Sequence, residues 1–82
     1  MKNPEQAKAQ AKSQINVIER VYNIRITNLE EVIETIIEKT LDADTILTIC
    51  TALNTWVAMN TPHRGAVEIP LEVVNGLMEK IL

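Results

Sequence analysis

The stretch that decides the fold is DADTILTICTALNTWVAM, residues 42–59. Its apolar residues recur every three or four positions, which is the period of an α-helix that buries one side. That side carries Ile46, Ile49, Cys50, Leu53, Trp56 and Val57, with Leu47, Ala52, Ala58 and Met59 beyond it. Because the segment is apolar most of the way round, we expect it to be the central, buried helix. Asp42 and Asp44 stand where they can cap its positively polarised first turn.

Two more helices are predicted before this segment. The first begins at Asn3-Pro4, because asparagine accepts hydrogen bonds from free amides and proline suits the first helical position. The second begins where Thr27 with Glu30, or Asn28 with Glu31, forms a capping-box pattern. The apolar stripes are Ala7, Ala11, Ile15, Ile18 and Tyr22 for the first helix, and Leu29, Val32, Ile33, Ile36, Ile37 and Leu41 for the second. Residues 22–26 break the first stripe, and we interpret them as briefly extended.

A fourth helix is predicted to open at Pro70, with an apolar stripe at Leu71, Val74, Leu77, Met78 and Ile81. Proline and glycine make residues 61–65 a loop, and residues 66–69 suit a short extended segment. The sequence therefore predicts an all-α fold, a small bundle of about four helices in one domain, residues 1–82. We expect Leu29, Val32, Ile36, Ile49, Leu53 and Val57 in its core.

Charge and hydropathy limit the partners and the compartment. The chain has eleven acidic and eight basic residues, and this net charge of −3 argues against nucleic acid as a ligand. Residues 1–25 carry five basic and two acidic groups, a net charge of +3, whereas residues 26–82 carry three basic and nine acidic groups, a net charge of −6. The lone cysteine, the polar MKNPEQAKAQAK opening and the absence of a long apolar run predict a cytoplasmic protein without direct membrane insertion.

The residues that could carry chemistry are few. His63 is the only imidazole, and it stands thirteen positions from Cys50, the only thiol. That spacing forms neither a nucleophile pair nor a metal-binding cluster. We interpret His63 as an exposed or capping loop residue and Cys50 as a small buried apolar residue. We therefore expect the protein not to be an enzyme and to use neither a cofactor nor a metal.

A row of carboxylates on the second helix is the first candidate for partner binding. Glu30, Glu34 and Glu38 follow one another at four-residue spacing, with Glu31 alongside. Like charges at this spacing repel each other by a few tenths of a kcal/mol in an isolated helix. Three interpretations stay open: a solvated face, a docking surface for a basic segment, or a row neutralised within the fold by Lys8, Lys12 and Arg20 of the first helix.

A set of apolar residues is the second candidate for partner binding. A tryptophan at a position like that of Trp56 is usually a core anchor, although tryptophan is also enriched at binding hot spots. The last helix ends on an apolar pair, and part of its apolar stripe can stay uncovered by the bundle. Such a stripe can bind a partner in the helix-in-groove mode. The candidate apolar contacts are Trp56, Leu77, Met78 and Ile81.

Taken as a whole, the chain resembles the accessory lysis-inhibition proteins of T-even bacteriophages, which are small cytoplasmic antiholins. The resemblance rests on the 82-residue length, the MKNPEQAKAQAK opening, the absence of a signal or span, and TPHRGAVEIPLE at residues 61–72. It implies binding to the short cytoplasmic N-terminal segment of the phage holin, a delay of host lysis together with a periplasmic antiholin, and recruitment to the inner membrane by that partner. It assigns no site residue.

Two alternatives of another class stay open. One is a helical module that associates with copies of itself. The other is a small adaptor that binds and modulates a host or phage enzyme. A pull-down with holin peptide against a scrambled peptide separates both from the antiholin interpretation.

Overall fold

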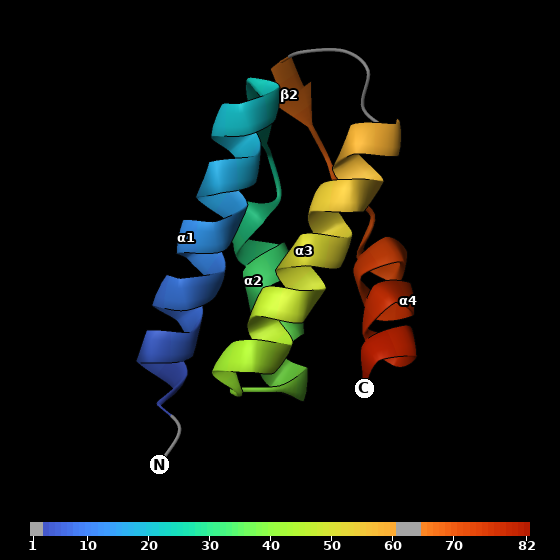
Figure 1. The fold of residues 1–82 in the computed structure, drawn as a ribbon. Coiled ribbons are helices and arrows are strands. Elements are labelled where there is room, and N and C mark those ends of the chain that lie inside the picture. The colour runs from blue at the N-terminus through green and yellow to red at the C-terminus, as the bar shows by residue number, and fades with distance from the viewer. Residues whose placement is uncertain (1–2, 61–64) are drawn as a thin grey trace.

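Four helices and a pair of short strands make up the described part of this computed structural model, residues 3–60 and 65–82 (Figure 1). The elements in chain order are α1 (Pro4–Tyr22), β1 (Ile24–Ile26), α2 (Leu29–Lys39), α3 (Ala43–Asn60), β2 (Gly65–Val67) and α4 (Leu71–Ile81). The predicted all-α bundle is confirmed, with the short extended segment before the last helix.

The helices form a four-cornered bundle. α1 packs against α2 and α3, and α4 packs against the same two helices. α2 and α3 therefore occupy opposite corners, and in Figure 1 α2 lies behind the layer that α1 and α3 form. The outer side of α2 and the outer side of α3 consequently face in opposite directions.

One apolar core lies between the four helices. Of the six residues expected there, five are buried, namely Val32, Ile36, Ile49, Leu53 and Val57, and Leu29 is partly buried against them. The expectation of a central, buried helix holds only for the inward side of α3, where Ile46, Ile49, Cys50, Leu53 and Val57 are buried. Leu47 is 44% exposed and Met59 is 77% exposed, because α3 is a corner of the bundle and only its inward half is covered.

The predicted starts of α1 and α3 are confirmed. Asn3 Oδ1 accepts a hydrogen bond of 2.8 Å from the backbone N–H of Glu5, and Pro4 occupies the first helical position. Asp42 Oδ2 accepts hydrogen bonds from both the backbone N–H and the hydroxyl of Thr45, at 3.0 and 2.9 Å. Each aspartate or asparagine thus satisfies amides that the helix itself leaves free.

The predicted capping box of α2 is wrong. The helix begins at Leu29, but no side chain caps it. The Thr27 hydroxyl donates instead to the carbonyl of Val67, at 3.3 Å. The Asn28 amide binds Ile69, donating to its carbonyl at 2.6 Å and accepting from its N–H at 3.0 Å.

These contacts extend the pairing of the two strands. β1 and β2 are parallel, with Ile24 opposite Gly65 and Ile26 opposite Val67. A parallel pair needs a long crossover, which α2 and α3 supply here. Beyond Ile26, the buried Asn28 side chain takes the place of a backbone peptide and continues the hydrogen bonding to Ile69.

Candidate protein-binding face

The four carboxylates predicted as a row lie together on the outer side of α2. Glu30, Glu31, Glu34 and Glu38 are all exposed. At about 100° per residue, they fall within an arc of roughly 100°. The buried residues Val32, Ile33 and Ile36 lie on the opposite side of the helix. We call the four carboxylates the acidic face.

The acidic face has no partner within the described residues. No ion pair or hydrogen bond joins its four side-chain carboxylates to another side chain there. The basic residues of α1 that could have neutralised them, Lys8, Lys12 and Arg20, are exposed and form no such pair. The interpretation in which α1 neutralises the row through ion pairs is therefore wrong, which leaves a solvated face or a docking surface.

The apolar candidates are less accessible than the carboxylates. Trp56, Leu77 and Ile81 are partly buried and pack against the core. Met78 is only 2% exposed, so it belongs to the core and offers almost no surface to a partner in this conformation. The structure thus does not gather the four side chains into one exposed patch.

A groove between α2 and α4 adds residues that were not candidates on sequence grounds. Its volume is about 460 Å³, and its lining comprises Lys39, Asn75, Met78, Glu79 and Leu82. Leu82 is 62% exposed beside it. The groove joins the end of α2 to the end of α4, and no spacing within either helix indicates that the two ends meet.

Side chains that could bind a metal ion do not cluster in the described part of the chain. Within residues 3–60 and 65–82, no group of three or more His, Cys, Asp or Glu side chains could hold a metal ion. His63 falls between these two ranges, outside the described residues. Cys50 is a buried free thiol, as expected.

Burial of Cys50 also makes the stability of the fold depend on pH. Desolvation raises the pKa of its thiol from 9.0 to about 11. Between these values the unfolded chain loses a proton that the folded chain keeps. We therefore expect stability to be unaffected by this group below pH 9 and to fall as the pH rises to 11, by up to about 3 kcal/mol.

The measurement is urea unfolding of wild type and Cys50→Ala at several pH values. The two proteins differ only at residue 50, so the difference between the two curves isolates the thiol. A difference that stays constant from pH 8 to 11 would contradict the prediction.

The fold and the acidic face together define a small four-helix bundle that exposes one row of unpaired carboxylates. No protein-family model, curated protein or solved structure matches the chain. Among the helices described, none has the length and apolar character needed to cross a membrane.

Proposed function

We propose that this chain is a protein-binding domain, without catalytic activity, that receives a basic segment of its partner on the acidic face. The observation that carries the proposal is that four exposed carboxylates share one side of α2 and have no ionic partner among the described residues. Their mutual repulsion is unfavourable in the free protein. A Lys- or Arg-rich ligand relieves that repulsion on binding, so complementary charge favours association.

The resemblance to T-even accessory antiholins suggests which basic segment binds. Cytoplasmic segments next to a membrane span tend to be rich in Lys and Arg. We therefore propose that the ligand is the cytoplasmic N-terminal segment of a phage holin, bound in the host cytoplasm at the inner membrane. Holding that segment would delay lysis. The α2–α4 groove, with Leu82 at its rim, supplies an apolar contact near the end of the acidic face.

The test removes the charges without removing the side chains. In Glu30→Gln/Glu34→Gln/Glu38→Gln, we expect affinity for a holin-tail peptide to fall roughly tenfold, because three screened surface charges contribute about 0.5 kcal/mol each. Raising the salt from about 50 to 500 mM shortens the Debye length from roughly 14 to 4 Å, so wild-type affinity should fall as well. Calorimetric titration measures both effects.

The matched control is Glu5→Gln/Glu68→Gln/Glu72→Gln. These three exposed glutamates lie outside α2, so the control changes the net charge equally but leaves the acidic face intact. We expect it to bind like wild type. Equal affinity of all three proteins, with no salt dependence, would show that the acidic face is only solvated.

A scrambled peptide of identical composition tests the partner itself. Weaker binding of the scrambled peptide supports a holin-specific site. If the two peptides bind equally, the acidic face still acts as a receptor for basic segments. That result would contradict the antiholin proposal and would favour the adaptor alternative.

A further inference from the structure

The surface along the line where α1 and α3 meet carries no charged side chain, unlike the outer side of α2. From Thr45 to Asn60, sixteen consecutive residues include no Asp, Glu, Lys or Arg. On α1, the side next to α3 carries glutamines and valines, and Lys8, Lys12 and Glu19 fall on its other side. The surface we call the charge-free face consists of Gln14, Val17, Val21, Leu47, Thr51 and Asn54.

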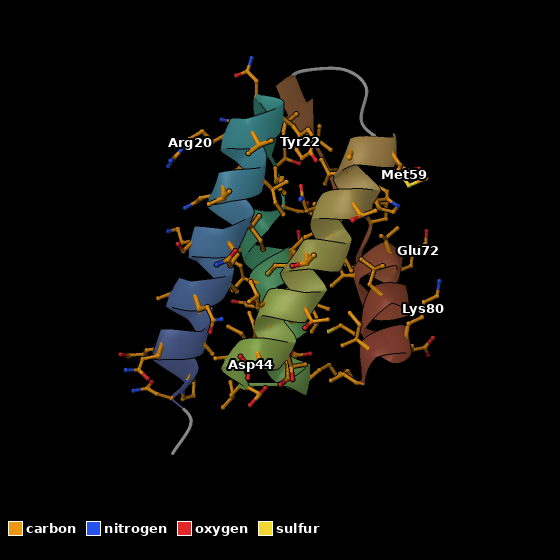
Figure 2. All side chains as sticks on the ribbon, in the orientation of Figure 1. Arg20, Tyr22, Asp44, Met59, Glu72 and Lys80 are labelled. Carbon is orange, nitrogen blue, oxygen red and sulfur yellow. The ribbon has the colours of Figure 1, made fainter. Side chains whose placement is uncertain are left out.

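The two helices present this face side by side. A shallow groove of about 90 Å³ runs between them, lined by Gln14, Val17 and Val21 of α1 and by Thr51 and Asn54 of α3. Figure 2 shows α1 and α3 side by side, with α2 behind them. Arg20 projects from α1 away from α3, and Asp44 lies at the start of α3, so these charged side chains border the face (Figure 2).

Three side chains of the charge-free face are both apolar and exposed to solvent. Val17, Val21 and Leu47 are 48%, 66% and 44% exposed, and they are three of the five exposed large apolar residues within residues 3–60 and 65–82. Removing such side chains from water is favourable in proportion to the apolar area buried.

The one threonine of the charge-free face already uses its hydroxyl hydrogen. Thr51 donates it to the carbonyl of Leu47, four residues earlier, at 2.8 Å. A threonine hydroxyl has one hydrogen to donate, so this side chain brings no unsatisfied donor into a contact. Covering Thr51 therefore leaves no polar hydrogen without a partner, and such an unpaired hydrogen would oppose association.

We propose that the charge-free face binds a second copy of this chain and forms a symmetric dimer. Charge selects this occupant, because two chains of net charge −3 can meet here without opposing like charges while the acidic faces stay outward. In a two-fold interface each residue set meets itself, and the amides of Gln14 and Asn54, which both donate and accept, are compatible with identical amides.

The size of the face sets the expected strength. The six residues span about 11 Å along each helix, and with the reach of their side chains they cover roughly 15 by 20 Å, or about 300 Å² per copy. Two copies then bury about 600 Å², which is below the roughly 1,200 Å² of stable specific interfaces and in the range of weak, transient contacts. The dimer is therefore expected to be weak and to depend on protein concentration.

The test is sedimentation equilibrium of Val17→Lys/Val21→Lys against wild type. In a symmetric dimer the two substitutions place four lysines in one interface, so we expect the dimer dissociation constant to rise at least about tenfold. The matched control is Met59→Lys/Leu82→Lys, which also exchanges two exposed apolar residues for lysine. Met59 projects from the side of α3 away from α1 (Figure 2), and the control should dimerise like wild type.

Two results would overturn the proposal: a wild type that stays monomeric up to about 1 mM, or an equal effect of the two double variants. Circular dichroism of both variants checks that the bundle remains folded. Cosedimentation of monomeric wild type with lipid vesicles would assign the face to a membrane surface instead. The basic peptide binds α2, whereas the dimer forms through α1 and α3. The calorimetric test of peptide binding and the sedimentation test of dimerisation can therefore succeed or fail independently.

Discussion

Leu53→Ala is expected to lower the free energy of unfolding by about 2–5 kcal/mol, which is enough to unfold much of a domain this small. Leu53 is 1% exposed and lies in the middle of α3, facing the core between the four helices. Truncation removes three carbon atoms from that core and leaves a cavity. Tight packing on all sides allows only partial collapse, so the loss exceeds the transfer free energy of the missing atoms.

The measurement is urea unfolding followed by circular dichroism. Met59→Ala is the control, because Met59 belongs to the same helix but is 77% exposed, and its truncation should change stability by less than about 0.5 kcal/mol. Similar losses in the two variants would contradict the arrangement of the core described above.

Asn28→Ala is expected to lower the free energy of unfolding by about 2–4 kcal/mol, which is a large effect for a polar residue next to a helix start. The substitution removes both hydrogen bonds to Ile69, at 2.6 and 3.0 Å. Ile69 is fully buried, so its N–H and carbonyl would then lack a partner in a place that water reaches poorly. An unsatisfied buried polar group costs about 1–3 kcal/mol, and two such groups are left here.

Two control variants separate this role from ordinary capping. Thr27→Ala removes only an exposed 3.3 Å hydrogen bond to Val67 and should cost less than about 1 kcal/mol. Asn28→Ser keeps a common capping residue but is too short to replace the amide, so it should be almost as unstable as Asn28→Ala. Wild-type stability of Asn28→Ser would mean that Asn28 acts as a helix cap after all.

The sequence alone determined the local structure of this protein and the position of its acidic row. Apolar spacing located the four helices, and Asn3 and Asp42 marked the starts of α1 and α3 correctly. These features depend on interactions within one helical turn, so neighbouring residues are sufficient to predict them. The same spacing placed four carboxylates on one side of α2, and that side is exposed.

Only the tertiary structure decided where each polar and apolar group found its partner. The Asn28 amide bonds to Ile69, forty-one residues away, rather than to its own helix, because β2 brings a buried peptide within reach. Met78 is buried and Leu47 is exposed, although the local sequence around each is apolar. Each helix is a corner of the bundle, so only the side chains that point inward are covered by the other helices. Lys8, Lys12 and Arg20 form no ion pair with the acidic face. Contacts between residues distant in the chain depend on how helices pack, and no local spacing contains that information.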